Sequence, residues 1–257
     1  RTQNLRIPLV VGGIDTVFAD LNGDPTDNLD PALDPATGML YPGSKTYGAT
    51  WVLRPGDQSV NRTADYRKIQ LMPFGEQVPY LDLIPGFQEK IVQIGTFESG
   101  EYAPPVGILI GGSPTEPAQE LRMGFSICFE DLFPSLHRHY ARGGAQVFIN
   151  TTNDAWFDNS SGPAWHLHMA RWRTIESGLP MVRCTNSGMT VILDGVGRIV
   201  KALPTMKPAI LTAELKLLPQ PPLTLHTRFG DWFGFLSLIA SLAIWISTLR
   251  MRIDEEA

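Results

Sequence analysis

Short apolar runs, separated by clusters of Gly, Pro, Asn and Asp, recur along most of this chain. Runs of four to eight residues rich in Val, Ile and Phe between such clusters are typical of β-strands. The pattern predicts strands at 7–18, 46–53, 66–72, 106–110, 121–127, 146–150, 181–186, 191–195, 198–202 and 209–215. The stretch 20–44 is rich in Asp, Asn, Pro and Gly and shows little periodicity, so a long loop is expected there.

Two segments have the features of helices. The first is predicted at 134–142, because Pro134 suits a first helical turn and two glycines at 143–144 suit a C-terminal stop. The second is predicted at 164–177 and ends before Gly178. Strands outnumber helices, but the strand-helix-strand alternation in the middle of the chain favours a layered α/β fold over a β-sandwich.

The C-terminal part contains one long apolar run in place of short ones. Residues 232–249 are 18 residues without a charge, at the lower limit for crossing a hydrocarbon core of ~30 Å. This predicts one transmembrane helix at 229–250. Arg250 and Arg252 would place its far end, with the tail 251–257, in the cytoplasm, and the remaining domain on the opposite side. A buried core helix and a peripheral amphipathic helix are the alternatives.

Composition narrows the classes of function. The chain has 257 residues, 43% hydrophobic and 18% charged, as in an ordinary packed protein with one large α/β domain or two small ones. Its net charge of -5, with scattered basic residues, argues against a nucleic-acid partner. Cys184 is interpreted as a small buried hydrophobe. The histidine pairs are spaced by two, a poor geometry for a metal on a helix, so no metal or cofactor is expected; they are His137 and His139, and His166 and His168.

Cys128 is the strongest candidate for chemistry. It ends an apolar strand and precedes a predicted turn and helix, which would expose its sulfur beside backbone N–H groups able to hold an oxyanion. A nearby cation would favour the reactive thiolate. Lys68 lies on a strand that ends soon after it, so both residues could meet at one edge of a sheet. Taken singly, Lys68 is better explained as a solvated strand residue, and Glu76 as a loop carboxylate. A redox-sensing thiol protein would need a resolving cysteine at a useful spacing.

The order of the motifs is more specific than any one of them. Lys68 is followed eight residues later by Glu76 in a Pro-Phe-Gly-Glu run, and Cys128-Phe129-Glu130 comes downstream. This order resembles the carbon-nitrogen hydrolase (nitrilase) superfamily, and within it the apolipoprotein N-acyltransferases. Further stretches support the narrower resemblance, and they are 152–157, 168–171, 183–188 and 227–232.

The resemblance implies a nitrilase-like α-β-β-α sandwich over residues 1–226, followed by the transmembrane helix, with a Glu-Lys-Cys triad. Cys128 would take an acyl chain from a phospholipid as a thioester and pass it to the N-terminal amine of a diacylglyceryl-cysteine lipoprotein. Lys68 would stabilise the anions by its charge, and Glu76 and Glu130 would support the site. Phe129 stands where the family often has Tyr. The implied location is the bacterial inner (cytoplasmic) membrane, with the catalytic domain on the periplasmic side.

The triad is incomplete in this sequence. The family's first member, a Glu that acts as general base, lies upstream of the segment that corresponds to residues 1–13. Glu98, Glu101 and Glu120 are available carboxylates, but their contexts do not resemble that motif. The membrane helices that precede the domain in the family have no counterpart either. We therefore expect a C-terminal fragment that is inactive alone.

Other interpretations are open at this point. A nitrilase-type amidase would hydrolyse a small amide, with water as the second nucleophile. A catalytically dead, membrane-anchored interaction domain would also account for the missing Glu. Asn153, Asp154 and Trp156 follow a predicted strand end and are candidates for lining the substrate pocket.

Overall fold

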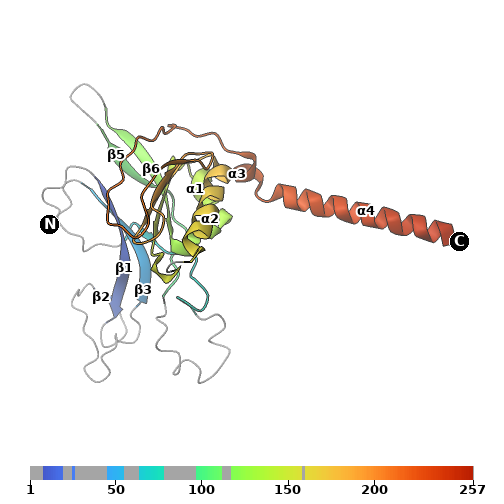
Figure 1. Ribbon diagram of the computed structural model, residues 1–257, viewed down its shortest axis with the longest axis horizontal. Coiled ribbons are helices and arrows are strands. Elements are labelled where there is room, and N and C mark those ends of the chain that lie inside the picture. Colours follow the sequence, from blue (N-terminus) through green and yellow to red (C-terminus); the bar gives the residue numbers. More distant parts are fainter. Residues whose placement is uncertain are drawn as a thin grey trace, which may run out of the picture.

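The computed structural model describes residues 8–19, 25–26, 45–54, 64–77, 97–111, 117–157 and 160–256. Within these residues the strands form a six-stranded and a four-stranded sheet, with helices beside them (Figure 1). The order of elements and the layers together show an α/β fold.

The six-stranded sheet has a parallel centre and antiparallel edges, in the order β10-β9-β8-β7-β6-β5. Its central strands β6, β7 and β8 are parallel, so their C-terminal ends lie at one edge of the sheet. Helical crossovers connect them, which brings the segments after β6 and β7 to that same edge. The strands are β5 (Val106–Ile110), β6 (Gln119–Ile127), β7 (Val147–Thr152), β8 (Met181–Thr185), β9 (Val191–Leu193) and β10 (Ile199–Ala202).

The four-stranded sheet is antiparallel and packs against the centre of the larger one. Its order is β2-β1-β3-β4, with β1 at Leu9–Ala19, β2 at Pro25–Thr26, β3 at Lys45–Leu53 and β4 at Tyr66–Arg67. The ring of Tyr66 stacks on Phe125 of β6, with 6.1 Å between ring centroids. Gly12 of β1 lies so close to β7 that a Cβ there would stand 3.0 Å from Thr151 Oγ1.

Helices cover the other face of the six-stranded sheet (Figure 1). They are α1 (Pro134–Arg142) and α2 (Gly162–Ser177), preceded by the short 3-10 helices η3 (Cys128–Leu132) and η4 (Ala155–Phe157). Tyr140 of α1 packs onto β6 where Gly124 leaves room, since a Cβ at position 124 would stand 2.7 Å from the Tyr140 side chain. The described residues thus form an α-β-β arrangement, and they include no second helical layer of the predicted sandwich.

Two predicted strands differ from the structure. The strand expected at 66–72 is paired only at Tyr66–Arg67, after which the backbone is held by separate bonds, such as that from Lys68 N to Gly48 O at 2.7 Å. The strand expected at 209–215 belongs to neither sheet, and its side chains are mostly exposed. The apolar run predicted a strand wrongly, because such a run does not decide whether the segment pairs with a sheet.

The C-terminal part contains α3 (Leu225–Phe229) and α4 (Trp232–Glu256). Thr227 of α3 is buried, and Thr224 caps the helix by accepting a hydrogen bond from Thr227 N at 3.0 Å. The predicted domain boundary after residue 226 therefore lies inside a helix that packs with α1 and α2. In contrast, α4 projects away from the body (Figure 1). None of the helices in the described ranges is long and apolar enough to span a bilayer, so the span predicted at 229–250 is not confirmed.

Candidate active site

Cys128 occupies a sharp turn between β6 and the helices. Its backbone is left-handed, with φ of 51°. For a residue other than Gly this conformation costs roughly 1–3 kcal/mol, and such strain is found mainly at functional sites. The 3-10 helix η3 starts at Cys128 itself and α1 follows at Pro134, so the strand, turn and helix occur in the predicted order. The Cys128 side chain is partly exposed.

Lys68 is a buried cation beside a partly exposed carboxylate. Only 1% of its surface is exposed, and its ammonium lies 2.7 Å and 2.6 Å from the two carboxylate oxygens of Glu76. Glu76, with a side chain 25% exposed, also accepts a hydrogen bond from Met72 N at 2.9 Å. The Lys68 carbonyl accepts a further bond from Gly100 N at 2.7 Å. The ammonium is therefore fixed in position and carries a counter-charge, as a buried cation must.

Glu130 connects the Lys68 segment to the Cys128 turn. One of its oxygens accepts hydrogen bonds from Ile69 N at 2.7 Å and Gln70 N at 2.9 Å. The other accepts from Tyr66 Oη at 2.6 Å and from Ile127 N at 2.8 Å. One fully buried carboxylate thus binds the residues next to Lys68 and the residue before Cys128.

Burial shifts the pKa values of Glu130 and of Tyr66, which donates a hydrogen bond to it. It raises the pKa of the Glu130 carboxyl, although the hydrogen bonds from Tyr66 and three backbone N–H groups work against that rise. Burial, together with the Glu130 charge, also raises the pKa of Tyr66 well above its usual value. The phenol of Tyr66 therefore stays protonated and donates a hydrogen bond to the Glu130 carboxylate.

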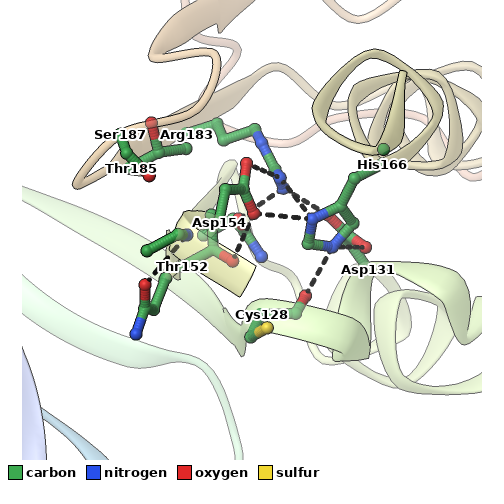
Figure 2. Close-up of polar contacts among 12 residues, drawn as sticks. Cys128, Asp131, Thr152, Asp154, His166, Arg183, Thr185 and Ser187 are labelled. Carbon is green, nitrogen blue, oxygen red and sulfur yellow. Dashed lines mark hydrogen bonds and ion pairs between the residues drawn. The ribbon is translucent and has the colours of Figure 1, made fainter. Parts of the chain in front are cut away.

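A second set of charges lies on the helix side of Cys128. We call Asp131, Asp154, His166 and Arg183 the arginine cluster (Figure 2). Arg183, fully buried on β8, donates from Nη1 to Asp131 Oδ2 and to Asn150 Oδ1, the latter at 2.7 Å. Its Nη2 donates to Asp154 Oδ2 at 3.3 Å. Three consecutive segments of the sheet edge and α2 therefore meet around one guanidinium.

His166 joins this cluster to the Cys128 turn. Its Nδ1 lies 2.8 Å from Asp154 Oδ1, and its Nε2 lies 3.0 Å from Asp131 Oδ1. Nε2 also contacts the Cys128 carbonyl oxygen at 3.2 Å, as drawn in Figure 2. Burial alone would lower the pKa of His166, but the two carboxylates outweigh it and raise the pKa to about 9. The imidazole is therefore a cation at neutral pH.

Comparisons with known proteins show which family this chain belongs to. The profile of the family described as carbon-nitrogen hydrolase matches residues 37–218, which is most of the chain. This chain belongs to the carbon-nitrogen hydrolase family. It is 34% identical over 208 residues to the apolipoprotein N-acyltransferase of Geobacter metallireducens, covering 81% of this chain and 37% of that protein. It is 33% identical over 241 residues to apolipoprotein N-acyltransferase 1 of Treponema denticola, covering 92% of this chain and 40% of that protein.

The chain therefore spans about two fifths of the length of these curated relatives. Among solved structures, a carbon-nitrogen hydrolase from Helicobacter pylori G27 overlaps it with a TM-score of 0.49 at 15% identity, over 80% of this chain and 61% of that one.

Sequence reasoning missed the arginine cluster of this carbon-nitrogen hydrolase. It treated His166 only as half of a poor metal pair, although it correctly expected the two rings to point apart: His166 is buried and His168 is exposed. A usable signal was Arg183 in the middle of an apolar strand. A charge at a buried strand position requires counter-charges, and Asp131 and Asp154 both follow strand ends at the same edge.

The remaining predicted residues lie in different surroundings. Asp154 is 1% exposed and lines a cavity of about 310 Å³ together with Gly188. Asn153 is exposed and accepts a hydrogen bond from Asn186 Nδ2 at 2.7 Å, while Trp156 is 85% exposed. A role of these three residues in binding substrate stays a prediction.

The interpretation of Cys184 as a buried residue is wrong. Cys184 is exposed. On β8 the side chains alternate, so those of Met181 and Arg183 face the helices and are buried, whereas that of Cys184 faces the opposite side near the end of the strand.

Proposed function

We propose that this chain carries the acyl-transfer site of an apolipoprotein N-acyltransferase. In this proposal Cys128 accepts a fatty acyl chain from a phospholipid and passes it to the N-terminal amine of a diacylglyceryl-cysteine lipoprotein. Membership of the carbon-nitrogen hydrolase family and the curated relatives support it. The observation that carries it is the buried Lys68 ammonium, on a segment that Glu130 ties to the strained turn at Cys128.

The proposed chemistry has two balanced halves. The Cys128 sulfur bonds to the acyl carbonyl carbon, the ester C–O bond breaks, and the lysophospholipid leaves with the proton that the thiol gave up. The lipoprotein amine then attacks the thioester, the C–S bond breaks, and the sulfur regains a proton from the amine as the amide forms. Each half passes through an oxyanion, which N–H donors and a fixed cation stabilise.

Lys68 suits the role of the fixed cation. An ammonium has three N–H donors, and within the described part of the chain the hydrogen bonds of the Lys68 ammonium go to Glu76 alone. The remaining donor capacity is available to a thiolate or an oxyanion. Glu76 holds the ammonium in place, and its own position is fixed by the bond from Met72 N. The catalytic domain, predicted to end at residue 226, would extend to the end of α3 at Phe229.

A lipid substrate fits the surface of α4. Its side chains from Trp232 to Thr248 are all exposed, including Phe235 at 67% and Ile239 at 62%. Exposed apolar surface of this extent marks a contact with a membrane or a partner. We propose that α4 lies in the bacterial inner membrane and holds the catalytic domain at its periplasmic face.

The experiment follows the thioester. The full-length protein is reconstituted in vesicles of a phospholipid with an isotope-labelled acyl chain, and the Cys128 peptide is examined by mass spectrometry. A labelled acyl group that hydroxylamine removes, and that a diacylglyceryl lipopeptide discharges as an amide, is the expected result. Cys128→Ser should abolish it, and Cys184→Ser should leave it unchanged, because Cys184 is an exposed residue of β8, whereas Cys128 follows β6.

Other outcomes identify the alternatives. Hydrolysis of a small amide without acylation by phospholipid would indicate a nitrilase-type amidase. Absence of any Cys128 thioester would indicate a catalytically dead interaction domain. Deletion of residues 232–256 tests the membrane contact, because the shortened protein should no longer float with vesicles. Protease accessibility of the two ends of α4 distinguishes a helix that spans the bilayer from one that lies on its surface. The inactivity of these 257 residues alone stays a prediction.

A further inference from the structure

We propose that His166 is a positioning residue for acyl transfer at Cys128, a role that rests on the function proposed above. Its ring N–H binds the Cys128 carbonyl oxygen and so fixes the peptide that follows the nucleophile. The reacting acyl group would not touch His166 itself.

The geometry of the peptide bond explains how a hydrogen bond to the Cys128 carbonyl controls the direction of the Phe129 N–H. The Cys128 carbonyl and the Phe129 N–H belong to one planar trans peptide, in which they point in opposite directions. His166 Nε2 lies 3.2 Å from that carbonyl oxygen, on the side of the arginine cluster (Figure 2). Holding the oxygen therefore directs the Phe129 N–H away from the cluster. An N–H group just after the nucleophile is a common oxyanion donor.

The contact is needed because the backbone at Cys128 is strained. With φ of 51°, Cys128 would relax to an ordinary conformation if nothing held the turn. Glu130 holds the residue before it through Ile127 N, and His166 holds the carbonyl after it. The two contacts thus fix the turn on both sides of the sulfur.

The ring of His166 is itself fixed in either protonation state. As a cation it faces Asp154 through Nδ1 and Asp131 through Nε2, at 2.8 Å and 3.0 Å. As a neutral ring protonated on Nε2, it can accept the Arg183 Nη2–H at Nδ1, a distance of 2.9 Å. The cation and this neutral tautomer both keep a proton on Nε2, so both can donate a hydrogen bond to the Cys128 carbonyl.

Two neutral amides separate positioning from packing. In His166→Gln the amide nitrogen reaches about as far as Nε2, whereas in His166→Asn it reaches only as far as Nδ1. Both variants remove the charge, but only Gln can bind the Cys128 carbonyl. With a p-nitrophenyl acyl ester, the burst of p-nitrophenolate from the full-length protein measures Cys128 acylation through an oxyanion. We expect at least a tenfold lower burst rate in the Asn variant and less than a threefold loss in the Gln variant.

A reaction without an oxyanion is the control. Alkylation of Cys128 by iodoacetamide, followed by mass spectrometry of its peptide, should change less than threefold in both variants. His168→Gln, on the exposed side of the same helix, should leave burst and alkylation unchanged. Equal losses in the Gln and Asn variants, or a parallel loss of alkylation, would overturn the positioning role.

The same assay separates this inference from the function on which it rests. An unsubstituted protein with no burst would overturn both. A burst without transfer to the lipopeptide would refute only the proposed acceptor, and the Gln and Asn pair would still decide the role of His166.

One measurement needs no variant and so does not depend on folding of a mutant. With histidine labelled by nitrogen-15 and cysteine carbonyls by carbon-13, the hydrogen bond should give a slowly exchanging Nε2 proton coupled to the Cys128 carbonyl carbon. A rapidly exchanging Nε2 proton without that coupling would contradict the proposal.

Discussion

Two groups of charges are connected to the Cys128 turn, one through Glu130 and one through His166, and they are built differently. Lys68 and Glu76 form a single pair in which the carboxylate is 25% exposed. The arginine cluster has two cations and two carboxylates, all almost completely buried, and each member contacts at least two others. A charge with spare donor capacity can respond to a new anion, whereas charges that already face one another hold each other in place.

The difference predicts what each group contributes. Within the described residues, removing Lys68 breaks a single pair, so the loss should be mainly in reaction rate. Removing a member of the arginine cluster leaves other buried charges without partners, which is strongly destabilising. Loss of Lys68 should therefore mainly lower the reaction rate, and loss of a member of the arginine cluster should mainly lower the stability of the fold.

Lys68→Met tests this comparison with the largest expected effect. The substitution keeps the length and apolar stem of the side chain but removes the charge that would stabilise the oxyanion. We expect the burst rate of Cys128 acylation to fall by about 10²–10³-fold. Lys201→Met is the matched control, because Lys201 is exposed and, among the residues that the structure describes, its ammonium donates a hydrogen bond only to the Thr212 carbonyl. A loss of less than about tenfold in Lys68→Met would contradict the assignment of the cation.

Glu130→Gln tests the connection between the Lys68 segment and the Cys128 turn. Both carboxylate oxygens accept two hydrogen bonds, so an amide NH2 in either place would face two donors. We expect the free energy of unfolding to fall by about 2–4 kcal/mol, with a lower acylation rate, because breaking a buried set of bonds leaves donors unpaired. Glu120→Gln, at an exposed position of β6, should change neither. Urea unfolding and the burst assay measure the two effects, and an unchanged unfolding free energy would show that Glu130 is not a structural connection.

The sequence predicted the backbone frame well, because that frame depends on local signals. Apolar runs identified the central strands, and Pro134 and the two glycines at 143–144 identified both ends of α1. The turn at Cys128 was predicted because a strand followed by a turn and a helix has a local pattern. These features depend on neighbours in the chain, so a single sequence contains them.

The contacts that assemble the site were harder to predict, because they join segments far apart in the chain. Glu130 binds residues about 60 positions away, and His166 reaches Cys128 over 38. No local pattern encodes such pairings, and the reasoning about His166 looked only at its own helix. The same limit explains the error at 209–215, where pairing with a sheet decides between strand and coil.

The smallest expected effect is on the pH dependence of stability, and it distinguishes the arginine cluster from the pair of Lys68 and Glu76. The pKa of His166 is raised to about 9 from an ordinary value of about 6.5. A raised histidine pKa stabilises the fold fully below about pH 6.5, and this contribution, on the order of 3 kcal/mol at most, is lost as the pH rises through about 9. Above that pH Asp131 and Asp154 face Arg183 with only one positive charge left in the cluster. Urea unfolding between pH 6 and 10 should therefore show an alkaline loss of stability in the unsubstituted protein and in His168→Gln, and a much smaller one in His166→Gln. Equal alkaline losses in all three would assign the effect to another group and remove the second cation from the cluster.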